Sequence, residues 1–248
     1  MKIIDSFIFY NELTMLHFRL CELYDHVDFF VIVESNKTFV GKEKPYYIEE
    51  YKYLFNRFFD KIIYIKVNDN LNFDNAWDRE YYQRDCIANG FVGFDENDVI
   101  IVSDVDEIPN VNLINQVKNN QLLVDKIYSL EQDMYYYNLN CLFKEKWNKP
   151  RILKLKNLNT SISKLRKIKN LGTIKNAGWH FSYFGDISTV INKIKNFSHQ
   201  EYNNQEVLNL DNLEKRIDNN EDLFNRNIAM IKKEIDPSQL PKNYTLLL

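Results

Sequence analysis

Residues 98–110 read DVIIVSDVDEIPN, and this stretch is the most informative part of the sequence. Four apolar residues run directly into three carboxylates, Asp104, Asp106 and Glu107, and a proline follows two residues later. A short apolar run of this kind is typical of a strand that is buried on both faces. Uncompensated carboxylates at the end of a buried strand are energetically costly, so the pattern indicates that a cation lies beside them.

Strand and helix patterns alternate in the part of the chain that precedes this stretch. Parallel sheets covered by helices have this alternation, so we expect an α/β fold with a mostly parallel central sheet flanked by helices. Ligands of such sheets bind beyond the carboxyl ends of the strands, which is where the three carboxylates lie. The expected strands are residues 3–10, 28–35, 61–67 and 98–104, and the expected helices are residues 11–27, 47–59 and 76–91.

The chain after residue 110 has a looser pattern, which predicts an α+β C-terminal half. The sequence contains no low-complexity linker or internal repeat, so a single domain of residues 1–248 is the simplest organisation. Helices are expected at 111–120, 187–197 and 208–235, a strand or hairpin at 127–143, a further strand at 151–158, and an extended tail at 236–248.

The composition restricts the class of partner. The chain has 248 residues, of which 45% are hydrophobic, and a formal net charge of -3. Domains that bind nucleic acid usually carry a basic excess, so we expect no nucleic-acid partner and favour small molecules or neutral polymers. Three widely separated cysteines indicate neither a disulfide framework nor a zinc site.

We expect a soluble chain that works in the cytoplasm. The sequence has no run of about 18 uncharged apolar residues and no apolar signal-peptide segment at its N-terminus, which predicts neither an anchor nor a transmembrane segment. Its richness in Asn, Ile, Lys and Tyr is typical of an AT-rich genome, such as that of a bacterium or of a large virus in its host's cytoplasm.

The spacing of Asp104 and Asp106 suits a shared divalent cation. When the chain turns after the strand, which Pro109 favours, carboxylates at i and i+2 can point toward one ion. Mg²⁺ and Mn²⁺ prefer oxygen ligands and often complete their coordination with substrate phosphates, so the pattern favours a metal-bound nucleotide diphosphate over a solvated acidic turn. Glu107 is either an outer hydrogen-bond acceptor or a solvated turn residue.

Five segments of the chain match a known family in their order and residues. They are FIFYNELTMLHFRLCELYDHVDFFVIVESNKTFVGKEKP at 7–45, WDREYYQRD at 77–85, DVIIVSDVDEIPN at 98–110, AGWHFSYFG at 177–185 and FSHQEYN at 197–203. They closely resemble glycosyltransferase family 17, the family of the bisecting β-1,4-N-acetylglucosaminyltransferase of N-glycans. The resemblance implies a GT-A type fold and a metal-dependent, inverting sugar transfer, with UDP-N-acetylglucosamine as the expected donor.

The resemblance assigns a role to each half of the expected domain. Residues 1–110 correspond to the nucleotide-sugar-binding half, and residues 111–248 supply the acceptor site and complete the metal site. The D-x-D motif of the family falls on Asp104 and Asp106, which implies bound Mn²⁺ or Mg²⁺. His180 lies where many GT-A enzymes have a late histidine that binds the metal or the diphosphate. A packed core histidine is the alternative, because His180 stands between two aromatic residues.

Two groups of residues are the expected contacts of the donor. The first follows or ends the first two expected strands, where we expect the uridine, and the second carries the positive charge that a diphosphate requires. Asn11 is equally suited to capping the following helix, and the arginines are equally typical of a solvated helix surface. A lysine-rich loop is more typical of solvated surface. The first group is Asn11, Glu12, Glu34 and Ser35, and the second is Lys42, Lys44, Arg79 and Arg84.

An inverting transfer requires a base on the acceptor side, and aromatic rings there would stack on sugar rings. No spacing rule selects one base among four candidates. His199 either lines the acceptor side or caps a helix. The candidate bases are Glu131, Asp133, Asp186 and Glu201, and the candidate aromatic platform is Tyr135, Tyr136, Tyr137, Trp179 and Phe181, of which Tyr136 is more typical of the core.

The sequence leaves the acceptor open among surface polysaccharides, lipid-linked glycans and glycoproteins. Two other functions are compatible with it. A non-catalytic carbohydrate- or nucleotide-sugar-binding protein of the same fold would bind the donor without turnover. A metal-dependent phosphohydrolase would release phosphate without an acceptor, although such enzymes usually need more His and Asp ligands than four scattered histidines supply.

Overall fold

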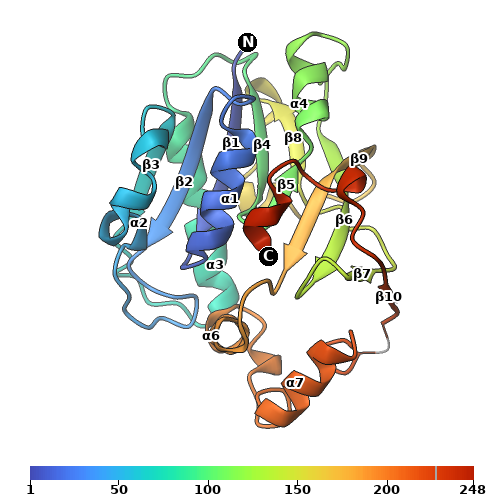
Figure 1. The fold of residues 1–248 in the computed structure, drawn as a ribbon. Coiled ribbons are helices and arrows are strands. Elements are labelled where there is room, and N and C mark those ends of the chain that lie inside the picture. Colours follow the sequence, from blue (N-terminus) through green and yellow to red (C-terminus); the bar gives the residue numbers. More distant parts are fainter. Residues whose placement is uncertain (227) are drawn as a thin grey trace.

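Four parallel strands form the centre of the computed structural model, which describes residues 1–226 and 228–248 (Figure 1). They run in the order β4 (Val99–Asp104), β1 (Ile3–Phe9), β2 (Phe29–Ser35) and β3 (Ile62–Val67). The first three are apolar on both faces, which explains why they lie inside the molecule. The sequence predicted all four strands, and each observed strand is one residue shorter than expected.

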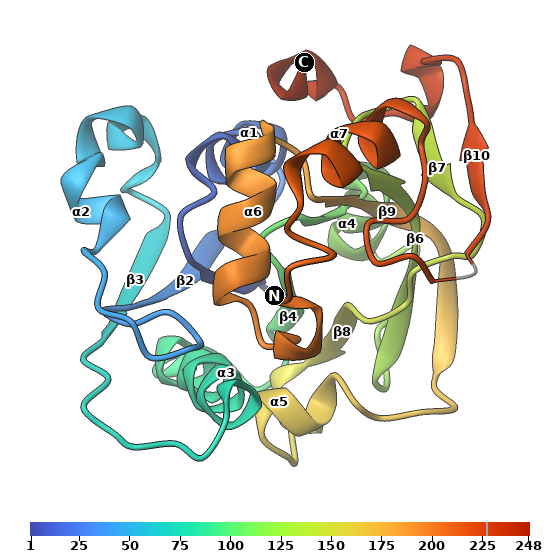
Figure 2. The same ribbon diagram turned by 90° about the horizontal axis from the view of Figure 1, so that it is seen from below.

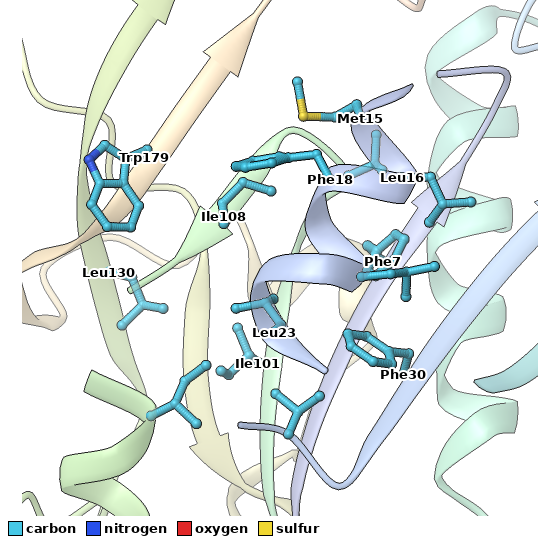
Figure 3. Close-up of a cluster of buried hydrophobic side chains, with 14 of the residues drawn as sticks. Phe7, Met15, Leu16, Phe18, Leu23, Phe30, Ile101, Ile108, Leu130 and Trp179 are labelled. Carbon is cyan, nitrogen blue, oxygen red and sulfur yellow. The ribbon is translucent and has the colours of Figure 1, made fainter. Parts of the chain in front are cut away.

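Helices cover both faces of this parallel centre. α1 (Leu13–Leu23) lies on one face and α3 (Ala76–Asp85) on the other (Figure 1). Successive side chains of a strand point to opposite faces, so each strand contributes residues to two hydrophobic clusters. Figure 3 shows the cluster beneath α1. Full burial of one such side chain is worth roughly 1.5–3 kcal/mol. The α1 side buries Phe7, Phe30 and Ile101, and the opposite side buries Ile4, Val31 and Ile100.

The remaining strands extend the sheet beyond β4 in mixed directions. They are β5 (Glu107–Pro109), β6 (Tyr128–Tyr136), β7 (Cys141–Phe143), β8 (Arg151–Lys154), β9 (Gly172–Ser182) and β10 (Met230–Lys232). β8 is antiparallel to both β4 and β6, whereas β9 runs parallel to β6. The short β5 pairs with β9 in a register that sets Glu107 opposite His180. The fold is therefore mixed α/β, with parallel strands at its centre.

The other helices are α2 (Tyr47–Glu50), α4 (Val111–Lys118), α5 (Ile162–Leu165), α6 (Ile187–Asn196) and α7 (Leu210–Asp218). α6 and α7 lie beyond the end of the sheet toward which β2 and β9 point (Figure 1). Across residues 1–226 and 228–248, every helix is too short or too polar to span a bilayer.

The expected helix at 47–59 was wrong beyond its first turn. After α2 the chain forms two 3₁₀ turns, Lys52–Leu54 and Asn56–Phe58. Phe55 and Phe58 are both fully buried, and residues three apart lie on one side of a 3₁₀ turn. The expected helix at 76–91 likewise changes to 3₁₀ after Asp85.

The C-terminal expectations were also partly wrong. The helix expected at 208–235 ends at Asp218, where Asn220 adopts a left-handed φ of 54°, and residues 230–232 form β10 instead. The tail expected to be extended contains 3₁₀ turns at Pro237–Gln239 and Tyr244–Leu247. The sequence reasoning missed β9, because glycines at both ends of its first half and a polar Lys-Asn pair hide the alternation of a strand.

Gly178 permits the close approach of β5 to β9, and its replacement tests this packing. A β-carbon there would lie 2.1 Å from the carbonyl oxygen of Ile108, and its φ is 149°. Gly178→Ala is expected to lower the free energy of unfolding by about 2–3 kcal/mol, measured by chemical denaturation. Gly93→Ala is the control, since nothing lies within 4 Å of its β-carbon and only its φ of 88° opposes alanine, at about 1 kcal/mol. Equal losses in the two variants would contradict the predicted clash.

Candidate active site

A cavity of about 320 Å³ lies at the carboxyl ends of β1, β4 and β9. The loops after β1 and β4 line it, and so does the segment from α6 to residue 226, which lies across these strand ends in Figure 2. The structure brings Glu12, Arg84, Asp104, Asp106 and His180 together around this cavity. The cavity is therefore at the edge of the sheet where the sequence predicted a ligand.

Arg19 fixes the turn that carries the acidic motif. Its guanidinium group is fully buried and makes two hydrogen bonds to Asp5, of 2.6 and 2.7 Å. Nη1 of the same group donates to the carbonyl oxygens of Asp104 at 2.6 Å and Glu107 at 2.9 Å. A bidentate carboxylate pair orients the guanidinium group, so α1 holds the backbone of the turn in one position.

Glu107 belongs to the framework of the turn. Its side chain is fully buried and accepts hydrogen bonds from Arg166 at 2.7 and 2.8 Å and from Trp147 Nε1 at 2.5 Å. It also accepts from the backbone N–H of Asp104 at 2.6 Å. Of the two alternatives for Glu107, the solvated turn residue is therefore excluded.

Two arginines bind the carboxylate of Asp104. Arg84 of α3 and Arg166 beside α5 each donate to its carboxylate, the latter at 2.9 Å. Burial alone would raise the pKa of Asp104, but the positive charges of Arg166 and Arg84 outweigh it and hold the pKa below its usual range. Asp104 is therefore ionised at neutral pH.

Asp106 faces a lysine and a histidine. Lys193 Nζ of α6 lies 2.8 Å from one carboxylate oxygen, and His180 Nε2 lies 3.5 Å from the other. Burial would raise the pKa of Asp106, but Lys193 and His180 lower it below the usual range. The other ring nitrogen of His180 is buried without a hydrogen-bond partner. The alternative of a fully satisfied core histidine therefore does not describe His180.

The side chains around the acidic turn fit a metal only in part. Carboxylate oxygens and an imidazole nitrogen are ligands that Mn²⁺ accepts, and Asp104, Asp106 and His180 share one cavity. Nowhere in residues 1–226 and 228–248 do three His, Cys, Asp or Glu side chains form a group that holds an ion by itself. An ion at this turn would therefore need further ligands, such as substrate phosphates, to complete its coordination.

A family model described as glycosyltransferase family 17 matches residues 1–233. The chain belongs to glycosyltransferase family 17. Membership of this family supports a transferase function.

Other comparisons add little to this family 17 assignment. The comparison with curated proteins found no match. Similar solved structures include HddC from Yersinia pseudotuberculosis, with 13% identity, 71% of this chain and 90% of that chain covered, and a TM-score of 0.40. A 4-diphosphocytidyl-2C-methyl-D-erythritolsynthase from Anaerococcus prevotii DSM 20548 has 10% identity and a TM-score of 0.38, with 70% of this chain and 87% of that chain covered. A mannose-6-phosphate isomerase from Helicobacter pylori has 13% identity and a TM-score of 0.39, with 63% of this chain and 72% of that chain covered.

Several expected donor contacts of the family 17 chain lie outside the cavity. Glu34 is fully buried and accepts hydrogen bonds from Lys44 at 2.7 Å, Tyr64 at 2.7 Å and the backbone N–H of Tyr47 at 2.6 Å. It therefore anchors the loop that follows β2. Lys44, and not Lys42, reaches the cavity.

Arg79, Ser35 and Trp179 also have framework positions, and Asn11 is half-buried outside the cavity. Arg79 pairs with the buried Asp69 at 3.0 Å, and Ser35 accepts from a neighbouring backbone N–H. Asn11 makes no side-chain cap of α1, so the capping alternative does not hold. The indole of Trp179 lies in the core beside Ile108 (Figure 3) and donates to the carbonyl oxygen of Gln239 at 2.8 Å.

The four candidate bases do not line the cavity. Asp133 pairs with Lys146, and Asp186 caps the N-terminus of α6. Glu131 is half-buried on β6. Glu201 is the candidate closest to the cavity by its contacts, because it accepts from Nδ1 of the lining residue His199 at 2.7 Å.

The aromatic wall of the cavity differs from the expected platform. Tyr135 and Phe181 are buried in the core beneath α1. Tyr136 was expected in the core, and it is buried in a hydrophobic cluster while one part of it also lines the cavity. Aromatic residues on the segment after α6 line the opposite part of the cavity. Among them Tyr202 stacks on Phe224, with 4.1 Å between the ring centroids.

The sequence reasoning missed the cations that neutralise the acidic turn. Arg19 stands in a helix between the apolar positions Leu16 and Leu23, so a charge on the buried face was a usable signal. Asp5 within an apolar strand was the matching signal. Lys193 lies on α6 and Arg166 directly follows α5, and both segments carry other lysines, so no pattern distinguishes them.

Removal of Arg19 tests the support of the acidic turn. Arg19→Met is expected to lower the free energy of unfolding by about 3–5 kcal/mol, because it leaves Asp5 buried without a counter-charge. The double variant Asp5→Asn/Arg19→Met is expected to recover part of that loss. Arg57→Met, at an exposed arginine, is the control and should stay within about 0.5 kcal/mol. A loss below about 1 kcal/mol for Arg19→Met, measured by urea denaturation, would contradict this role.

Proposed function

We propose that this family 17 chain is an inverting glycosyltransferase of GT-A type that moves a sugar from a nucleotide diphosphate donor to a glycan hydroxyl. The observation that carries the proposal is the meeting of Asp104 and Asp106 with Arg84, Lys193 and His180 around one cavity at the ends of parallel strands. UDP-N-acetylglucosamine is the donor that we propose first, in line with the family. Residues 1–110 then supply most of the donor site, and residues 111–248 supply the acceptor side.

The charges around the cavity are suited to a diphosphate leaving group. Asp104, Asp106 and His180 would hold Mn²⁺ or Mg²⁺, and the bound ion would neutralise the charge that develops on the leaving diphosphate. Arg84 and Lys193 are cations of the chain itself that line the same cavity. Fixed charges directed at a developing charge lower the barrier without reorganisation during the reaction.

The aromatic wall after α6 is suited to the acceptor. Phe197, Tyr202 and Phe224 line the cavity on the side of this segment, and aromatic faces pack on the apolar faces of sugar rings. His199 lies beside them and is bonded to Glu201, so we propose this pair as the base that takes the proton of the acceptor hydroxyl. The carboxylate would orient the imidazole for this proton transfer.

One observation favours the non-catalytic alternative. Asp104 and Asp106 are already neutralised by Arg84, Arg166 and Lys193, so the turn is balanced in charge without a metal ion. A protein that only binds nucleotide sugars could keep such a turn. Turnover therefore has to be measured together with binding.

A donor screen tests the transfer directly. UDP-, GDP- and dTDP-sugars are incubated with the protein and Mn²⁺, and release of the nucleotide is measured with and without EDTA. We expect release from a UDP-sugar that EDTA abolishes. Asp106→Asn is expected to lower the rate at least about 100-fold, with the fold retained by circular dichroism. Asp125→Asn, at an exposed carboxylate outside the cavity, should keep the rate. Donor binding without release in the wild-type protein would favour the non-catalytic alternative.

Replacement of Tyr202 tests the acceptor wall. Tyr202→Ala removes one aromatic face, which is worth about 0.5–1.5 kcal/mol, so the KM for an accepting oligosaccharide should rise roughly two- to tenfold. Hydrolysis of the donor without acceptor should stay unchanged, since the proposed donor contacts are elsewhere in the cavity. Tyr53→Ala, at an exposed tyrosine outside the cavity, is the control. A change in donor hydrolysis with no change in KM would contradict the assignment.

A further inference from the structure

Lys193 occupies the carboxylate that a metal ion would need. Its ammonium lies 2.8 Å from one oxygen of Asp106 and 3.8 Å from Glu12, and its side chain is one quarter exposed to the cavity. Lysine side chains are charged at neutral pH, so an ammonium stands beside Asp106.

The position of Lys193 follows from the packing of α6. Asp186 caps the N-terminus of this helix, and Val190 and Ile194 bury its apolar side. Lys193 stands next to Ile194, and its flexible four-carbon chain reaches from the helix to Asp106. The helix thus fixes the backbone of Lys193, while the ammonium keeps freedom to change partner within the cavity.

A metal ion at Asp106 has to compete with this ammonium. A metal ion and an ammonium beside the same carboxylate repel each other, and this repulsion is strong in a partly buried site. A nucleotide diphosphate changes the balance, since it brings negative oxygens that can accept both the ion and the displaced ammonium. Ion and nucleotide should then favour each other's binding.

We propose that Lys193 neutralises Asp106 in the donor-free protein and moves to the diphosphate when ion and nucleotide bind together. This inference rests on the proposed metal-dependent function. It makes Lys193 a residue that couples the two ligands. The ion alone binds weakly because the Lys193 ammonium already lies beside Asp106. The nucleotide alone binds weakly because Lys193 stays with Asp106 and does not contact the diphosphate.

The test is a calorimetric titration of the full chain with Mn²⁺ alone, with UDP alone, and with UDP in the presence of Mn²⁺. In the wild-type protein, Mn²⁺ is expected to tighten UDP binding at least tenfold. Lys193→Gln is expected to bind Mn²⁺ alone at least tenfold more tightly and UDP alone more weakly, so that the coupling between them falls. Lys193→Arg keeps the charge and should bind Mn²⁺ alone as weakly as the wild-type protein. Lys195→Gln, at the exposed lysine two residues away on α6, is the control and should match the wild-type protein.

The outcomes separate the role of Lys193 from the proposed function. Mn²⁺-dependent UDP binding by the wild-type protein, with no tighter Mn²⁺ binding in Lys193→Gln, would overturn the role of Lys193 alone. Absence of Mn²⁺ binding in both proteins, with or without UDP, would overturn that role and the metal-dependent function together. Should Lys193→Gln fail to fold in thermal denaturation, the wild-type titration still decides, because UDP binding that is indifferent to Mn²⁺ contradicts the proposed coupling.

Discussion

The buried pair of Arg19 and Asp5 is the interaction on which the rest of the site depends. Both side chains are fully buried, so neither charge tolerates the loss of its partner. The guanidinium group satisfies the carboxylate of β1 and three carbonyl oxygens of the turn after β4. Because the same group holds strand, helix and turn, the position of the acidic motif is set by the hydrophobic core beneath α1. A substitution that disturbs this core is therefore expected to move the acidic motif as well.

A second layer of charges then decides what the turn presents to the cavity. Glu107 turns inward and binds Arg166, and Arg166 in turn reaches Asp104. Asp104 and Asp106 are left with their carboxylates at the cavity, each beside a cation from a different helix. Three carboxylates within four residues would repel one another, and the arginines and lysine turn this repulsion into a fixed arrangement. Such preorganised charges are what a reaction with a charged leaving group requires.

The sequence was sufficient to predict the central strands and the edge that carries the acidic turn, and insufficient for the C-terminal half that lines the rest of the cavity. The central strands are continuous apolar runs, so their positions and the edge that carries Asp104 and Asp106 follow from local pattern alone. β9 carries His180, but its residues lack the alternation of a strand, and its pairing with β5 is set by contacts 70 residues apart in sequence. Long-range ion pairs have no local signature either. Glu34 looks like a ligand-binding residue at a strand end, and only its contacts with Lys44, Tyr47 and Tyr64 reveal that it anchors a loop.

The two sides of the cavity are held by different kinds of interaction, and this difference bears on how the protein could acquire new acceptors. The donor side is fixed by residues that are buried in the core and bonded to several partners. The proposed acceptor side is formed by α6, α7 and the connecting segment, which share a separate hydrophobic cluster with Tyr136 and Tyr183. Polar contacts such as Ser198 to Glu80 add to this packing. Surface segments tolerate substitution better than the core, so under the proposed function changes of aromatic residues there would alter the acceptor without disturbing the acidic turn. Lys193 is the exception on that side, because it is the residue of α6 that reaches across to Asp106 and makes the two sides depend on each other.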